Sequence, residues 1–242
     1  MRIHRSAGTS LAVISLGVCI VTACARPHDV ALSADALLAQ RASYPAHWWT
    51  PVPAEGAPGW EILPQAAGPG EVIVSKRHEL GLLSNFAATP FVFRGTRYAS
   101  VEGFWQMMLY PEGRDDLRAT APGADWAYSR VQVAQMAAFE AKHAGELAEQ
   151  QMARTGITWV SFEGNRFPYR PARPGRHFDL ILAAMRAKLQ QNPEVRQVLL
   201  ATGDLILRPD HVAEPNAPAA WRYCEIWMRI RTELRLSGAL RP

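Results

Sequence analysis

A single carboxylate stands out in residues 98–106, because it falls among bulky aromatic side chains at the start of a predicted short helix. Ser100 is a good N-cap residue, so the helix is expected to begin directly after it. Spacings of three, four and seven residues then place these side chains on one face: Glu102, Trp105, Gln106 and Leu109. A carboxylate on an apolar face is costly to ionise, so it is either paired or held near neutrality for acid/base work. The alternative is a Glu that only complements the helix dipole.

Length and composition indicate one sizeable globular domain, with residues left over for a tail or linker. The 242 residues are 48% hydrophobic and 20% charged, which is typical of globular proteins and unlike disordered or multi-span membrane proteins. The formal net charge of +4 falls to about +2 if a segment containing Arg2 and Arg5 is removed. So small a charge argues against nucleic acid as a partner.

The N-terminus has the features of an export signal. Arg2, His4 and Arg5 form a short basic region, and the apolar run 6–20 is too short to span a bilayer comfortably but suits the core of a signal peptide. The run closes with VTAC, which resembles the bacterial lipobox, so we expect residues 1–23 to be a lipoprotein signal peptide and Cys24 to be lipid-modified. A plain secretory signal is the alternative. By resemblance to the sorting rules of bacterial lipoproteins, Ala25 in place of Asp favours the periplasmic face of an outer membrane in a host with two membranes.

Cysteine usage agrees with export and lipidation. Cys19 would leave with the signal peptide, Cys24 would carry the lipid and Cys224 would remain alone, so no disulfide is expected. Cys224 falls in an apolar, aromatic helical stretch, which favours a buried structural thiol over a nucleophile.

Residues 24–69 are predicted to form the anchor and an arm rich in Pro and Trp. Repeated prolines between 45 and 64 prevent long regular structure. The arm has too many large aromatic residues for a free tether: Tyr44, Trp48, Trp49 and Trp60. We therefore expect it to pack across the surface of a domain formed by residues 70–242. A platform for carbohydrate or peptidoglycan is the alternative.

Within the domain, hydrophobic periodicity and turn residues predict short strands at 71–75 and 205–207 and a hairpin at 91–98. Residues 131–154 are expected to form two helices broken near Gly145, with a core stripe of Val133, Met136, Ala137 and Phe139. Further helices are predicted at 177–191, from Pro193 to Gly203, and at 219–236.

An arginine-rich loop follows Gly164. Four residues concentrate positive charge there: Arg166, Arg170, Arg173 and Arg176. Solvated loop charge is one interpretation and contact with a phosphate is the other, because the arginine fork matches phosphate oxygens.

Four blocks of the domain resemble the NADAR (YbiA-like) family. They are GLLSNF at 81–86 with Pro90-Phe91, YASVE at 98–102 with Gln106, EAKHAG at 140–145, and MRAKLQQNPEVRQVLLATG at 185–203. The resemblance covers about residues 70–235. It implies a single, mainly helical domain with a small antiparallel β-sheet, an α+β fold, and cleavage of N-glycosidic bonds at a ribose anomeric carbon. The family's substrates are ribosylamino-pyrimidine phosphates and ADP-ribose attached to nucleobases.

The resemblance assigns roles to particular residues. Glu102 matches the family's glutamate, and a carboxylate there can stabilise the charge that develops on ribose, activate water or move a proton to the leaving nitrogen. Asn85, Phe86, Trp105 and Gln106 are expected to bind substrate by stacking and hydrogen bonding. The His residues show no paired metal-ligand spacing, and no dinucleotide-binding glycine motif occurs, so neither a metal nor another cofactor is expected.

The chain departs from the family pattern at two positions of the same helix. Gly103 stands where the family has His, and Leu109 stands where it has Lys. We expect Lys142 to supply the missing basic group, with Lys76 as a second possibility, and Lys76 and Arg77 to reach phosphate.

The family's Trp-Gly loop is also absent in its usual form. Its region contains Asp210, His211 and Trp221, which we take as substrate-binding or catalytic candidates. Asp210-His211 could be a replacement acid/base pair, or a turn Asp beside a surface His.

These observations predict a membrane-anchored N-glycosidase for a ribosylated or ADP-ribosylated small molecule or nucleobase. The alternative is a catalytically silent lipoprotein that binds a nucleotide or ADP-ribose.

Overall fold

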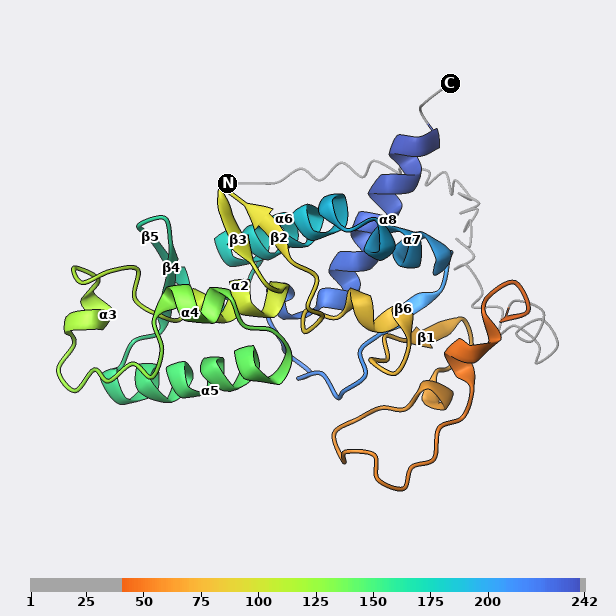
Figure 1. Ribbon diagram of the computed structural model, residues 1–242, viewed down its shortest axis with the longest axis horizontal. Helices are drawn as coiled ribbons and strands as arrows, with labels where there is room; N and C mark the ends of the chain where they lie inside the picture. The colour runs from red at the N-terminus through yellow and green to blue at the C-terminus, as the bar shows by residue number, and fades with distance from the viewer. Residues whose placement is uncertain (1–40, 240–242) are drawn as a thin grey trace, which may run out of the picture. The chain divides into compact units, whose positions relative to one another are not determined.

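Helix α2 (Val101–Met107) carries Glu102 and is buried along its whole length. The computed structural model describes residues 41–239, which belong to one compact unit, Ser33–Pro242. Within it α2 contacts α4 (Arg130–Ala134), α5 (Ala138–Thr155) and α6 (Arg176–Gln191), and Figure 1 shows α2 between α5 and α6. A helix with no solvent face needs neighbours on every side, so α2 is the centre of the core.

The start of α2 is fixed by a hairpin and a cap, as predicted. Strands β2 (Phe91–Phe93) and β3 (Thr96–Tyr98) pair antiparallel across a turn in which Arg94 and Gly95 have φ values of 50° and 77°. Ser100 Oγ then accepts a hydrogen bond from the Gly103 N–H at 2.8 Å and donates to the Met136 carbonyl at 2.9 Å. The cap is therefore tied to the neighbouring helix pair, which holds the first turn in place.

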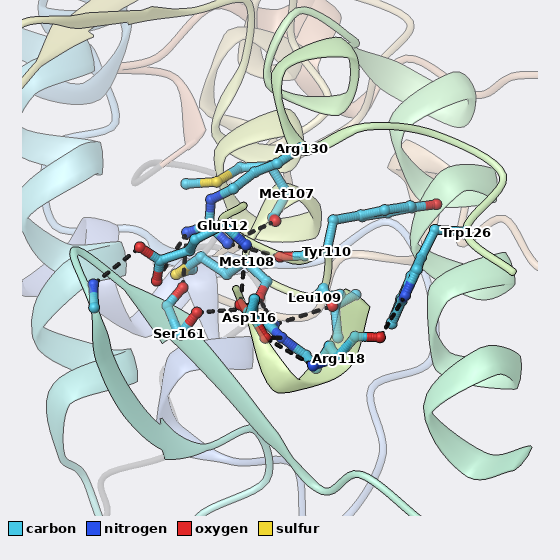
Figure 2. Close-up of polar contacts among 11 residues, drawn as sticks. Met107, Met108, Leu109, Tyr110, Glu112, Asp116, Arg118, Trp126, Arg130 and Ser161 are labelled. Atoms are coloured by element: carbon cyan, nitrogen blue, oxygen red, sulfur yellow. Dashed lines mark hydrogen bonds and ion pairs between the residues drawn. The ribbon is translucent and has the colours of Figure 1, made fainter. Parts of the chain in front are cut away.

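The end of α2 is held by a buried arginine. Arg118 has no exposed surface, and its guanidinium donates to the carbonyls of Met108 at 2.7 Å and Leu109 at 3.1 Å (Figure 2). The same group donates to Ser161 Oγ at 2.5 Å and forms a two-pronged ion pair with Asp116. A cation at these carbonyls is favoured by the helix dipole and satisfies acceptors that the helix leaves unpaired.

A second arginine binds the same end of the helix. Arg130 donates to the carbonyls of Met107 at 3.2 Å, Tyr110 at 2.9 Å and Ser161 at 2.7 Å (Figure 2). Burial lowers its pKa to about 10, and the nearby Glu112 acts in the opposite direction. Both arginines precede the helical stretch that the sequence predicts at residues 131–154.

Between residues 41 and 239, the strands form three separate pairs. Strand β1 (Glu71–Ile73) pairs parallel with β6 (Ile206–Arg208), and β4 (Trp159–Phe162) pairs antiparallel with β5 (Asn165–Pro168). With the β2–β3 hairpin, these short pairs beside helices that make up the larger share of the regular structure confirm the expected α+β fold. The detail differs from the expected antiparallel sheet because β6 joins β1 only after the chain has passed through the helices, and it arrives in the same direction.

The break in the 131–154 helical stretch lies at residues 135–137, and the prediction of a break at Gly145 was wrong. Gly145 lies inside α5 and is buried there. The real break is stabilised from outside, because the Ala138 N–H donates to the Phe86 carbonyl at 3.1 Å and the Met136 carbonyl accepts from the Ser100 cap. Phe139, predicted to be core, is 54% exposed.

The remaining helices follow the predicted order. Helix α6 and helix α7 (Pro193–Ala201) match the expected segments, with Pro193 in the first turn. The expected helix at 219–236 consists of a 3-10 turn, η4 (Ala219–Trp221), and α8 (Tyr223–Ala239).

The described part of the arm packs on the domain, as expected. Trp48 and Trp49, in the 3-10 turn η1 (Ala46–Trp49), are 1% and 8% exposed, and their indole N–H groups donate to Glu79 Oε1 and to the Glu71 carbonyl. Burial excludes these two residues from a carbohydrate platform. The expected signal peptide at 1–23, Cys24 and residues 25–40 of the arm lie outside the described residues.

Candidate functional site

A cavity of about 770 Å³ opens beside the first turn of α2. The three side chains expected to act in catalysis all line it: Glu102, Lys142 and His211. Most of those expected to bind substrate line it too: Lys76, Asn85, Phe86, Trp105, Gln106 and Trp221. The fold therefore brings residues from distant blocks of the sequence to one cavity. Its volume is within the range of about 300–1,000 Å³ that is usual for small-molecule sites.

Glu102 is the buried carboxyl group of this cavity. It is 7% exposed, and its Oε1 accepts a hydrogen bond from Gln106 Nε2 at 2.8 Å. Burial raises the pKa of Glu102, although this hydrogen bond and the charges of Lys142, His211 and Lys76 act to lower it. The net rise favours the protonated form, which is what a general acid requires. A carboxylate that only complemented the helix dipole would be expected in solvent.

Gln106 orients the Glu102 carboxyl group and depends on a glycine to do so. The Gln106 Oε1 atom is buried and has no hydrogen-bond partner among residues 41–239. A Cβ atom at Gly145 would lie 2.0 Å from Oε1 and 2.3 Å from the side-chain amide carbon. Gly145 therefore provides the space in which the Gln106 amide lies, and this, rather than a helix break, is its function in α5.

Gly145→Ala is expected to destabilise the protein by about 1–3 kcal/mol, because the new methyl group collides with the Gln106 amide. The same change at Gly238, an exposed position in α8 with open space around it, is the matched control. There we expect stabilisation of up to about 1 kcal/mol from helix propensity. Urea unfolding of the two variants measures both, and equal signs would contradict the role assigned to Gly145.

Asn85 is presented by a loop that is anchored from behind. Its Oδ1 atom is buried and lacks a hydrogen-bond partner in the described part of the chain. The preceding residue, Ser84, accepts a hydrogen bond at its carbonyl from Lys188 Nζ at 3.0 Å, and burial lowers the pKa of Lys188 to about 7. The Trp227 indole donates to the Leu83 carbonyl at 2.5 Å. The loop is thus rigid, and the unpaired Asn85 acceptor is available to a ligand.

A chain of hydrogen bonds that the sequence did not predict crosses one wall of the cavity. Trp105 Nε1 donates to the Tyr169 hydroxyl at 3.2 Å, and this hydroxyl donates to Glu149 Oε1 at 3.0 Å. Trp221 packs against both Trp105 and Tyr169, with ring centroids 5.6 Å apart in each case, and its indole N–H is buried without a partner among the described residues. The wall therefore combines aromatic faces with a free donor.

Asp210, which was expected to bind substrate, does not line the cavity. It is 1% exposed, and both carboxylate oxygens are occupied: Oδ2 by Lys76 Nζ at 2.6 Å and Oδ1 by His211 Nδ1 at 3.2 Å. Burial acts to raise the pKa of Asp210, but these hydrogen bonds hold it below its ordinary value. An ionised Asp210 makes His211 Nδ1 the donor and leaves Nε2 for the cavity.

Arg77 is not among the lining residues either. Its guanidinium forms a two-pronged ion pair with Glu61, with Nε–Oε1 and Nη2–Oε2 distances of 2.7 and 2.6 Å. The pair fastens the arm to the domain and occupies the guanidinium that was expected to reach a phosphate. Lys142 lines the cavity on its exposed side, where its Nζ pairs with Glu146 Oε1 at 2.5 Å.

In the arginine-rich loop, two guanidinium groups lie over tryptophans. Arg166 lies 4.3 Å from the Trp159 ring centroid and Arg170 lies 4.1 Å from that of Trp221. Arg170 also pairs with Glu214 at 3.1 Å. Neither arginine lines the cavity, and these contacts account for their placement without a phosphate.

Gly103 and Leu109, the two positions that depart from the family pattern, are both enclosed by the core. A Cβ atom at Gly103 would lie 2.4 Å from the Met136 carbonyl oxygen, so no larger residue fits while α4 packs this closely. Leu109 has no exposed surface and contributes to the core. Neither position can supply a basic group to the cavity.

Cys224 lies in the core. Cys224 is 6% exposed and burial raises the pKa of its thiol to about 12, which confirms a structural thiol.

Residues 41–239 contain no group of three or more His, Cys, Asp or Glu side chains placed to bind a metal ion. No helix in the described region has the length and apolar character needed to cross a membrane.

Among solved structures, the NMR structure of the E. coli protein YbiA is similar to this chain. The chain aligns with the NMR structure of the E. coli protein YbiA over 70% of its own length and 89% of the other chain, with a TM-score of 0.44 and 17% sequence identity. No protein-family model matches the sequence, and no curated protein matches it.

Proposed function

We propose that the cavity is the active site of an N-glycosidase that hydrolyses the bond between a ribose anomeric carbon and a nitrogen atom. The observation that carries the proposal is the buried Glu102 carboxyl group, whose pKa is raised by burial and which faces a cavity with aromatic walls. Three of the four sequence blocks that resemble the NADAR family supply Glu102, Asn85, Gln106 and Lys142, all of which line this cavity.

The proposed reaction uses the Glu102 carboxyl group twice, first as an acid and then as a base. Protonated Glu102 donates its proton to the leaving nitrogen as the C–N bond breaks, and the bonding electrons leave with the nitrogen. The carboxylate that remains stabilises the positive charge on the ribose and then takes a proton from the water that attacks the anomeric carbon. Water is consumed, the glycosidic nitrogen gains a proton, and Glu102 returns to its protonated form.

The other lining groups would position the substrate. The unpaired Asn85 Oδ1 and Trp221 Nε1 atoms offer an acceptor and a donor for ribose hydroxyl groups or a base edge. Trp105 supplies a ring face beside Glu102, and Gln106 holds the carboxyl group in one orientation. Lys76 supplies positive charge for a phosphate, and His211, which Asp210 orients from behind, offers a ring nitrogen for hydrogen bonding.

The test is incubation of the purified protein with nucleosides that carry ADP-ribose on a base nitrogen, with free ADP-ribose measured by chromatography. We expect release that depends on protein concentration. A ribosylamino-pyrimidine phosphate, tested in parallel, identifies the smaller class of substrate. Binding of these compounds without release of either product would contradict the enzyme assignment.

One observation favours a second candidate, a catalytically silent protein that binds a nucleotide or ADP-ribose. Leu109 occupies, fully buried, the position where the resembled family carries a lysine. If that lysine is required for turnover, the cavity keeps the residues that bind the ligand and lacks a residue that cleavage needs. The same incubation separates the two candidates.

We also propose that Cys24 is the site of lipid attachment and that the protein is held at the periplasmic face of an outer membrane. Labelled palmitate is expected to enter the full chain, and Cys24→Ala is expected to abolish labelling and release the protein from membranes. Cys224→Ala, which changes the buried thiol, is the matched control and should label normally. Membrane association of the unlabelled Cys24→Ala protein would contradict this assignment.

A further inference from the structure

Exposed apolar side chains gather at the rim of the cavity. The exposed large hydrophobic residues of the described chain include two aromatic ones, Trp60 at 44% and Phe139 at 54%, and both line the cavity. Their ring centroids are 5.8 Å apart. Val212, 82% exposed, lines the cavity as well. Scattered single apolar residues need no explanation, but a cluster beside a cavity marks a binding surface.

The rim continues inward as a row of rings and one cation. The Phe139 and Phe86 centroids are 5.2 Å apart. The Lys76 ammonium lies 5.4 Å from the centroid of Trp60 and 5.1 Å from that of Phe86, and it is paired with the buried Asp210 at 2.6 Å. An ammonium group beside ring faces is placed to meet a ligand that joins a planar ring to an anionic group.

Trp60 belongs to the arm, but it is held firmly. The next residue, Glu61, forms the two-pronged ion pair with Arg77 and an antiparallel bridge with His211. The Ile62 N–H donates to the Asp210 carbonyl at 2.8 Å. The arm thus completes the cavity wall with a ring whose backbone is tied to the residues that orient Lys76 and His211.

We propose that Trp60 and Phe139 form an outer subsite that stacks against a nucleobase remote from the bond to be cleaved, with a phosphate next to Lys76. The ligand class is therefore a nucleotide with its own base, such as an ADP-ribosyl compound, rather than a ribosylated base alone. This inference rests on the proposed function in one respect: the scissile bond is placed at Glu102, in the buried part of the cavity, which leaves the exposed rim for the rest of the ligand.

Binding measurements without turnover test the outer subsite. Isothermal titration calorimetry with ADP-ribose, AMP and ribose 5-phosphate compares the wild-type protein with Trp60→Leu and Trp60→Phe. Trp60→Leu keeps an apolar side chain and removes the ring, so we expect about tenfold weaker binding of ADP-ribose and AMP, with ribose 5-phosphate changed less than about twofold. Trp60→Phe keeps a ring face and is expected to restore most of the affinity. Leu117→Ala, at an exposed apolar residue that does not line the cavity, is the control and should bind like the wild type.

Each outcome decides the inference separately from the proposed reaction. Equal ADP-ribose affinity in wild type and Trp60→Leu overturns the subsite, even if the protein is an active N-glycosidase. The subsite is also overturned if Trp60→Leu weakens the binding of ribose 5-phosphate as much as that of ADP-ribose, because an equal loss indicates general distortion. Failure of the wild type to bind ADP-ribose and AMP overturns it as well. Ring-dependent binding of ADP-ribose by a protein that releases no product would retain the subsite and refute the reaction.

Discussion

Arg118→Met is expected to lower the free energy of unfolding by about 3–5 kcal/mol. The variant removes the cation that binds the carbonyls of Met108 and Leu109, and it leaves the Asp116 carboxylate without its partner. The pKa of Asp116 is lowered to about 2: burial acts to raise it, but the hydrogen bonds from Arg118 outweigh this. Asp116 is therefore ionised at neutral pH and would stay ionised in a partly buried position. Chemical denaturation at neutral pH measures the loss.

The matched control for Arg118 is an arginine in an exposed ion pair. Arg235 pairs with Asp204 on the surface, so Arg235→Met is expected to change stability by less than about 1 kcal/mol. Arg118→Lys should fall between the two, because a lysine keeps the charge and loses the planar fork that reaches several acceptors at once. A loss of less than about 1 kcal/mol for Arg118→Met would show that the end of α2 does not depend on this contact.

Glu102→Gln is expected to lower the rate of base release by about 10²–10⁴-fold, the usual contribution of a general acid or base. Gln has nearly the same shape, and its side-chain oxygen can still accept the hydrogen bond from Gln106, so binding of ADP-ribose is expected to persist.

Glu102→Gln should also be more stable than the wild type at pH values above the raised pKa of Glu102. A carboxyl group whose pKa is higher in the folded state loses its favourable contribution as pH rises through that value, and an amide has nothing to ionise. Product release and thermal unfolding are measured on the same preparation, with Glu225→Gln, at an exposed residue that does not line the cavity, as control.

Local signals in the sequence identified much of the frame around the site. Ser100, followed by an apolar helical face, predicts where α2 starts, and the structure shows the cap. The hairpin before it and the two helices separated by Asn192 also follow from turn and proline positions. These features depend on contacts within a few residues, which periodicity and capping rules describe well.

Long-range contacts were harder to predict. The sequence favours a helix break at Gly145, because glycine weakens helices, but the residue is required by the amide of Gln106 on another helix. Phe139 has the spacing of a core residue, although it lies beside Trp60 at the cavity rim, 79 positions away in the chain. The pairing of Tyr169 with Glu149, and the burial of Arg118, likewise depend on partners that the local sequence does not reveal. The sequence offered one signal of such long-range contacts: a polar or aromatic residue to which local periodicity assigns no clear role.

The pH dependence of base release by the wild-type protein, measured beside Glu102→Gln from about pH 5 to about pH 9, tests the central claim most directly. If Glu102 is the acid, the wild-type rate falls as pH rises through its raised pKa, because the proton that the leaving nitrogen needs is lost, and Glu102→Gln shows neither the rate nor this decline. Equal rates for the two proteins, with the same pH dependence, would contradict the assignment of Glu102 as the catalytic group.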